Sequence, residues 1–159
     1  YTATLVGGRT VIFTTTNGTL ALTSTHGARS CFFTGFVNAQ ATIDAVCAAA
    51  AGTTDVTIVC AGTERHIALE DAVCAGRLVR GIRTAFPNAQ LGDGARLAEM
   101  IERPYQESAA ALASDATHAR SLITAGFEDD VIACLAVDSV PVAIRYSDRQ
   151  LRALPAGED

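Results

Sequence analysis

The chain has 159 residues, of which 49% are apolar, and its formal net charge is −5. A chain of this size can bury one substantial core, which predicts a single domain over residues 1–153 and a frayed tail over residues 154–159. The acidic balance argues against a nucleic-acid-binding surface. The chain has no lysine, which excludes Schiff-base chemistry and a Walker-type phosphate loop.

Two further features of the composition predict a cytoplasmic protein. The five cysteines are odd in number, widely spaced and without a C-x-x-C pair, as is typical of a reducing compartment. No apolar run is long enough to span a bilayer, and no signal peptide is recognisable, so no membrane association is expected.

The first half of the chain predicts three strand–helix units in succession. Each strand is a short run of β-branched and aromatic residues, and each following helix shows apolar residues at helical spacing. Such alternation favours a parallel sheet covered by helices, with the loops that follow the strands gathered on one rim. The predicted strands are residues 9–15, 30–34 and 55–60, and the predicted helices are residues 19–26, 39–51 and 69–86.

The second half of the chain shows a different pattern. An Ala-rich helical stretch over residues 95–113 is interrupted at Pro104, and a helix is predicted over residues 115–125. Two further strands are predicted over residues 131–137 and 142–146. The expected fold class is therefore α/β, a layered and mostly parallel sheet with helices on both faces and mixed strands towards the C-terminus.

A loop rich in hydroxyl groups follows the first predicted strand. Hydroxyls, a side-chain amide and a flexible glycine suit an oxyanion such as phosphate or sulfonate. Ordinary turn chemistry is the alternative, because Thr and Asn-Gly are common in turns. The residues concerned are Thr16, Asn17, Gly18 and Thr19.

A second candidate site follows the third predicted strand. Glu64, Glu70 and Asp71 could ligate Mg²⁺, which takes one or two carboxylates and keeps several waters. Because Glu70 and Asp71 are adjacent on a helix, their side chains point about 100° apart and cannot both face one ion squarely. Acidic residues in a first helical turn also complement the helix dipole without any metal.

Two reactive residue types occur beside these carboxylates. His66 could serve as an acid, a base or a phosphate donor, or could be an ordinary solvated histidine. Cys60 at a strand end invites comparison with cysteine phosphatases, but Arg65 follows after four residues instead of five, and Glu64 would oppose a phosphate. Cys60 is therefore interpreted as a core residue.

Short stretches that run through most of the chain resemble, in order and spacing, the 2-phosphosulfolactate phosphatase family. The family's His-Gly-Arg corresponds here to His118-Ala119-Arg120, which is a departure. The stretches are Thr14-Thr15-Thr16-Asn17-Gly18-Thr19, Ala21-Leu22, Asn38-Ala39, Val59-Cys60-Ala61-Gly62-Thr63, Leu69-Glu70-Asp71-Ala72, Ala75-Gly76, then Ser114, His118, Arg120, Leu122, Gly126-Phe127, Asp130, Cys134, Asp138 and Val140-Pro141.

The resemblance implies a magnesium-dependent enzyme associated with coenzyme M biosynthesis that converts 2-phosphosulfolactate to sulfolactate and phosphate. It implies Glu70 or Asp71 as metal or water ligands and Glu64 and His66 as proton carriers. The residues expected to bind the acidic phosphoester are Thr16, Asn17, Gly18, Thr19, Asn38, Gly62 and Thr63.

Members of this family carry a substantial N-terminal region with an acidic motif expected to help bind the metal. The 159 residues are therefore expected to be the C-terminal part of a longer protein, with that region as a partner. A sheet edge left exposed by the missing region would favour association, so a homodimer is also considered. The alternative function is a non-catalytic α/β domain that binds a small anionic metabolite or a partner protein.

Overall fold

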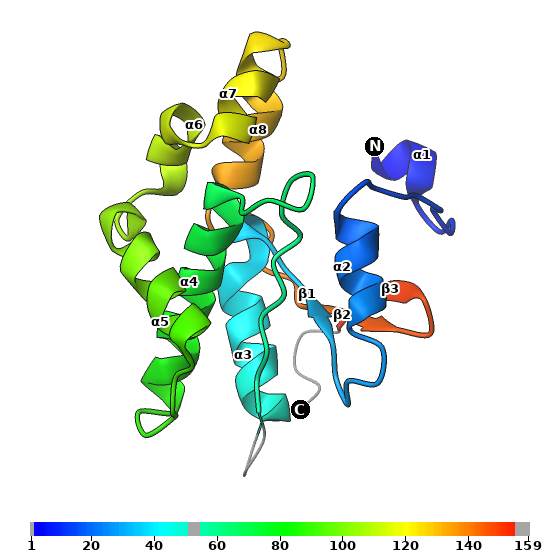
Figure 1. Cartoon of the computed structure of the whole chain (residues 1–159). Coiled ribbons are helices and arrows are strands. Elements are labelled where there is room, and N and C mark those ends of the chain that lie inside the picture. Colours follow the sequence, from blue (N-terminus) through cyan, green and yellow to red (C-terminus); the bar gives the residue numbers. More distant parts are fainter. Residues whose placement is uncertain (1, 51–54, 155–159) are drawn as a thin grey trace.

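The computed structural model describes residues 2–50 and 55–154, and it combines a group of helices with one small sheet (Figure 1). In chain order the helices are α1 (Ala3–Val6), α2 (Gly18–Ser24), η1 (Phe36–Asn38), α3 (Ala39–Ala49), α4 (Leu69–Ala85), α5 (Asp93–Glu102), η2 (Arg103–Tyr105), η3 (Ala109–Ala111), α6 (Leu112–Asp115), α7 (Thr117–Thr124) and α8 (Glu128–Leu135). The strands are β1 (Phe32–Phe33), β2 (Ile144–Ser147) and β3 (Gln150–Ala153).

Helix α4 packs between α3 and α5 at very close range. A Cβ atom at Gly76 would overlap the backbone carbonyl of Ala98 on α5, and one at Gly81 would overlap the side chain of Ile43 on α3. Glycine at these two positions therefore lets both neighbouring helices approach the α4 backbone. Across the α4–α5 contact, the guanidinium of Arg80 donates to the carboxylate of Glu102, with a shortest N–O distance of 2.9 Å.

The buried apolar residues form two clusters that α4 joins. The larger cluster lies against α6, α7 and α8 and includes Val73 of α4, whereas the smaller one lies between α3 and α4 and includes Leu78. Helix α4 thus contributes side chains to both clusters and connects the two halves of the core. The buried members are Phe36, Val73, Ala109, Leu112, Ala116, Ala119 and Val131 in the larger cluster, and Ala39, Ile43 and Leu78 in the smaller one.

The described residues form one three-stranded antiparallel sheet in the order β1-β2-β3. Phe32 pairs with Arg145, and β2 and β3 form a hairpin in which Ser147 pairs with Gln150. The two turn residues, Asp148 and Arg149, have φ values of 51° and 60°. Positive φ at both central positions is typical of a type I′ turn, whose twist matches that of the flanking strands.

A set of hydrogen bonds ties the start of α3 to the segment that leads into β2. Asp138 adopts φ 55°, and its carboxylate accepts a hydrogen bond from the Gln40 backbone N–H at 2.7 Å. The Asp138 N–H donates to the Phe36 carbonyl at 2.9 Å, and the Val140 N–H donates to the Val37 carbonyl at 2.8 Å. The first turn of α3 is therefore capped by a residue almost 100 positions later in the chain.

The mixture of helices and strands confirms the α/β composition, but the sheet differs from the predicted one. Residues 9–15 and 55–60, predicted as parallel strands, belong to no strand of the described residues. Residues 131–137, predicted as a strand, lie largely within α8. Three acidic residues precede this stretch, where they complement the dipole of a helix N-terminus.

Several other predicted elements are confirmed. The helices over residues 19–26, 69–86 and 115–125 correspond to α2, α4 and α7, and the helix predicted over residues 39–51 corresponds to α3, with residue 51 outside the described residues. The Ala-rich stretch breaks at Pro104 as predicted, within η2. Leu154 continues the hairpin by donating to the Ala143 carbonyl at 2.8 Å, and the rest of the predicted tail lies outside the described residues.

Candidate active site

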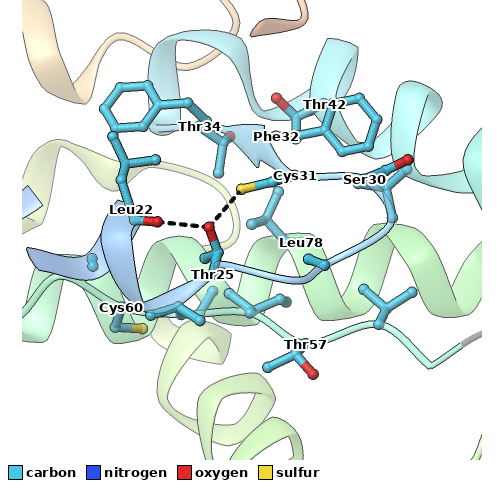
Figure 2. A pocket seen from close by; sticks show the side chains of 18 of the residues that line it. Leu22, Thr25, Ser30, Cys31, Phe32, Thr34, Thr42, Thr57, Cys60 and Leu78 are labelled. Atoms are coloured by element: carbon cyan, nitrogen blue, oxygen red, sulfur yellow. Dashed lines mark hydrogen bonds between the residues drawn. The ribbon is translucent and has the colours of Figure 1, made fainter. Parts of the chain in front are cut away.

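A cavity of about 600 Å³ lies between α2, β1, α3, α4 and the extended residues 55–60. Figure 2 shows side chains from these segments around it, including Thr25 and Cys31, whose thiol donates to the Thr25 hydroxyl at 3.4 Å. Most of the lining is aliphatic and aromatic, as is usual in small-molecule sites of this size. Two of the residues predicted to form the site, Gly18 and Asp71, lie on its wall.

The loop before α2 is held in shape by its own hydroxyl groups. The Thr15 N–H donates to the Thr19 hydroxyl at 3.0 Å, and the Thr19 N–H donates to the Thr15 hydroxyl at 3.2 Å. Asn17 is the residue before the helix, and its side chain makes no capping hydrogen bond. The amide of Asn17 is therefore uncommitted within the described structure, whereas the Thr19 hydroxyl already serves the loop.

The loop before α4 is closed by Asp71. Its carboxylate accepts a hydrogen bond from the Gly62 backbone N–H at 2.6 Å, and Gly62 itself has φ 69°. A Cβ atom at Gly62 would also approach the His66 carbonyl closely, so this position requires glycine both for its conformation and for space. The fold thus brings the predicted residues Gly62 and Asp71 into direct contact.

Glu64 and His66 lie on a tight turn that projects from this loop. Thr63 and His66 pair through two backbone hydrogen bonds of 2.8 Å and 3.1 Å. The two residues between them, Glu64 and Arg65, have φ values of 51° and 65°. The side chains of Glu64 and His66 are exposed beside the cavity loop and do not line the cavity.

The donor set for a magnesium ion is small. Within residues 2–50 and 55–154, no three His, Cys, Asp or Glu side chains gather closely enough to hold a metal ion. Mg²⁺ needs only one or two protein carboxylates when waters and substrate oxygens complete its shell. Asp71 fits this requirement because it lines the cavity, while the adjacent Glu70 does not.

Asn38, predicted to bind substrate, is buried and fully hydrogen-bonded. Its side-chain nitrogen donates to the carbonyls of Phe33 at 3.3 Å and Val142 at 3.1 Å. Its side-chain oxygen accepts from the Gly35 N–H at 2.9 Å. With 3% of its surface exposed, Asn38 connects β1, α3 and the segment before β2 and so has a structural role in the described fold.

The thiols of the cysteines beside the cavity are poorly suited to act as nucleophiles. Burial, followed by the nearby carboxylate of Asp71, raises the pKa of the Cys60 thiol, and burial raises the pKa of Cys74 from 9.0 to about 12. A nucleophilic cysteine needs a lowered pKa, because the thiolate is the reactive form. The prediction that Cys60 is a core residue is wrong, because its side chain is exposed at the edge of the cavity; its raised pKa nevertheless disfavours a nucleophilic role.

Two basic side chains line the cavity, although the sequence patterns did not single them out as site residues. His26 and Arg29 follow α2, and an Arg29 nitrogen donates to the Ala49 carbonyl at 3.0 Å. Their position after a short helix and before a strand was the only signal in the sequence. His118 and Arg120 of the family's motif do not line the cavity, and Arg120 donates to the carbonyls of Ser114 and Asp115 at 2.9 Å and 2.8 Å.

Comparisons with known proteins identify the family of this chain. A family model described as 2-phosphosulpholactate phosphatase matches residues 1–149. A protein of Symbiobacterium thermophilum named probable 2-phosphosulfolactate phosphatase is 30% identical over 151 residues, which cover 95% of this chain and 64% of that protein. Proteins of the same name from Caldicellulosiruptor saccharolyticus and Pseudothermotoga lettingae are 32% and 33% identical, with 61% and 63% of their lengths covered.

The chain with this mixed α/β fold and cavity thus matches the model of a phosphatase family along nearly its whole length. The chain belongs to the 2-phosphosulpholactate phosphatase family. It spans a little over 60% of the length of the curated relatives it matches. Among residues 2–50 and 55–154, no helix combines the length and hydropathy needed to cross a membrane.

Proposed function

We propose that the protein hydrolyses a small acidic phosphate monoester, and that 2-phosphosulfolactate, the substrate in its relatives' names, is converted to sulfolactate and phosphate. The observation that carries the proposal is the cavity that Gly18 and Asp71 both line. Gly18, the first residue of α2, could offer a backbone N–H to the cavity, and Asp71, in the first turn of α4, could offer a carboxylate. Phosphoryl transfer depends mainly on positioning and charge stabilisation, and these two kinds of group serve both needs.

The loop before α2 is proposed to hold the phosphate or the sulfonate. The Asn17 side-chain amide and the backbone N–H groups of Thr16 and Gly18 are its available donors, while Thr15 and Thr19 keep the loop in shape. Gly62 and Thr63 would contact the other end of the substrate from the opposite loop. His26 and Arg29, on the same cavity wall, would add to the attraction for an acidic substrate.

Asp71 is proposed as the protein's carboxylate ligand for Mg²⁺, and Glu70 as a charge that favours the N-terminus of α4. When bound, the ion would polarise the phosphoryl group and neutralise charge that develops on it. The hydrogen bond from the Gly62 N–H fixes one oxygen of Asp71 and leaves the other available. The exposed Glu64 and His66 are proposed to hold or deliver the proton that the leaving oxygen needs.

The adjacent carboxylates provide a matched test of this proposal. Asp71→Asn keeps an oxygen for the Gly62 N–H but removes the negative charge, and we expect a loss of activity on the order of 100-fold. Glu70→Gln makes the same chemical change outside the cavity and should keep nearly full activity. The measurement is phosphate release from 2-phosphosulfolactate with added Mg²⁺ and with a chelator, with circular dichroism as a check on folding.

Equal activity of the two variants would contradict the role of Asp71, and activity that survives the chelator would contradict the role of magnesium. The small donor set within the described residues favours one alternative, a domain that binds an anionic metabolite without turning it over. Calorimetric binding of 2-phosphosulfolactate without phosphate release would support that alternative.

The five unpaired cysteines support a cytoplasmic location.

A further inference from the structure

Residues 55–60 form an extended segment whose backbone has no partner among the described residues. No hydrogen bond within residues 2–50 and 55–154 involves its backbone N–H or carbonyl groups. The segment is rich in β-branched residues, and Figure 1 shows it running beside α3 and α4 without joining the sheet. An extended, unpaired backbone is a template for the addition of a strand.

The sheet presents a matching free edge to the same cavity. In the order β1-β2-β3, one edge of β1 pairs with β2, and the other edge has no strand beside it within the described part of the chain. Both Phe32 and Phe33 of β1 line the cavity, as do residues 55–60 on another wall. A single strand placed in the cavity would lie between these two segments and could pair with both.

The side chains around the cavity fit an apolar occupant. Its walls are mostly aliphatic and aromatic, and they include Val56 and Val59, which are 42% and 48% exposed. Burying such side chains against another apolar strand stabilises an assembly by about 25 cal/mol per Å² of apolar surface. The occupant that satisfies both the backbone and the side chains is an extended apolar polypeptide.

The curated relatives contain a candidate for this strand. About a third of the Symbiobacterium thermophilum relative lies outside the part that matches this chain. We propose that the cavity is the docking site for a β-strand from the polypeptide that the relatives carry outside the match, and that this strand joins residues 55–60 to β1 in one sheet. The proposal rests on the fold and the family. Because the same cavity carries the proposed substrate site, the docked strand would leave the substrate only the part beside Gly18 and Asp71.

A second copy of this chain is a poorer occupant. Its own segment 55–60 is anchored through Ile58, which packs against the cluster of Ala39, Ile43 and Leu78. To enter the cavity of another copy, the segment would have to leave this packing. A strand from a separate region has no such packing to lose.

The probe for the test is the unmatched region of the Symbiobacterium thermophilum relative, produced as a polypeptide and mixed with this chain. The relative's own matched part is the positive control. We expect a one-to-one complex in which the amides of residues 55–60 and of β1 become protected from hydrogen exchange, while those of α5 do not change. This readout requires neither Mg²⁺ nor turnover, so its failure would not be confused with failure of the phosphatase assay.

A pair of surface variants tests the location of the contact. Val59→Lys places a charge on the proposed contact, and we expect it to weaken the complex at least about tenfold. Ile132→Lys makes a similar change on α8 at a residue that is 58% exposed and outside the cavity lining, so it should leave binding unchanged. Circular dichroism of the two unbound variants checks that both remain folded.

Three results would overturn the proposal. The first is failure of the polypeptide to bind this chain, whether or not it binds the relative's own matched part. The second is self-association of this chain alone with protection of residues 55–60, which would make a second copy the occupant. The third is formation of a complex in which the Val59→Lys and Ile132→Lys variants bind equally well.

Discussion

At the scale of single residues, the ion pair between Arg80 and Glu102 is strongly asymmetric. The Glu102 side chain is 1% exposed, whereas that of Arg80 is 40% exposed. Glu102 accepts hydrogen bonds from the Arg80 guanidinium and, at 2.8 Å, from the Gln106 amide. The pair therefore consists of a carboxylate that depends on its partners and a cation that can return to water.

This asymmetry predicts which partner is harder to remove. Arg80→Ala leaves a buried carboxylate with one remaining donor, and we expect the free energy of unfolding to fall by about 3 kcal/mol. Glu102→Gln leaves no buried charge, because the exposed Arg80 can turn to solvent, and it should have a smaller effect. Urea unfolding of both variants measures the difference, and a larger loss for Glu102→Gln would contradict this account.

Cys74 predicts a specific pH dependence of stability. Burial raises its pKa from 9.0 to about 12 in the folded protein, so the folded state keeps the proton that the unfolded state loses. The stabilisation is fully present below about pH 9 and is lost progressively as the pH rises towards about 12. Cys74→Ala lacks this titration, and its unfolding midpoint should therefore fall less steeply than that of the wild type between about pH 8 and about pH 11. Parallel midpoint curves for the two proteins would show that the thiol does not contribute.

The residues of the candidate site were predictable only in part from the sequence. The polar loops before α2 and α4 could be recognised because Thr, Asn, Gly and acidic residues follow predicted strands. Sequence spacing could not distinguish Glu70 from Asp71, because the choice depends on the direction in which α4 faces the cavity. Nor could the sequence show that the Asn38 side chain already donates to the carbonyls of Phe33 and Val142, since Val142 is 104 positions away.

At the scale of elements, the contact between α4 and α5 depends on Gly76. We expect Gly76→Ala to destabilise the protein by about 2 kcal/mol, because the added methyl would overlap the Ala98 carbonyl and force the helices apart. Gly94→Ala is the matched control, since that position on α5 has open space around it. There the same change should stabilise the helix by about 0.5 kcal/mol. Thermal unfolding of the two variants should therefore shift in opposite directions, and a shift in the same direction would refute the packing argument.

The helices were easier to predict than the strands. Apolar residues at helical spacing identify α3 and α4 directly, because each buries one face against the core. The apolar stretch within α8 is too short for its period to separate a helix from a buried strand, and the acidic residues before it were the better signal. The β2–β3 hairpin was missed because its turn uses Asp148 and Arg149 instead of a glycine-containing pair.

At the scale of the whole molecule, the two core clusters are joined through α4 and should unfold together. Leu112 is fully buried in the larger cluster, and we expect Leu112→Ala to lower the free energy of unfolding by about 3 kcal/mol. Leu97→Ala is the control, because Leu97 is 58% exposed, and its effect should stay below about 0.5 kcal/mol. Far-ultraviolet circular dichroism and tyrosine fluorescence should give coincident transitions in each variant. Two separate transitions in Leu112→Ala would indicate that the clusters are independent.

The hydrogen bond between Asp138 and Gln40 also determines the order in which the chain can fold during synthesis. It closes a loop of 98 residues, and the pairing of β1 with β2 closes a still longer one. Closing a loop of roughly 100 residues costs about 4 kcal/mol of chain entropy, so these contacts should form last. Helices α3, α4 and α5 can assemble while the ribosome is still translating the rest. The sheet can form only after β2 and β3 have left the ribosome, and until then the phenylalanines of β1 remain exposed to other nascent chains and to chaperones.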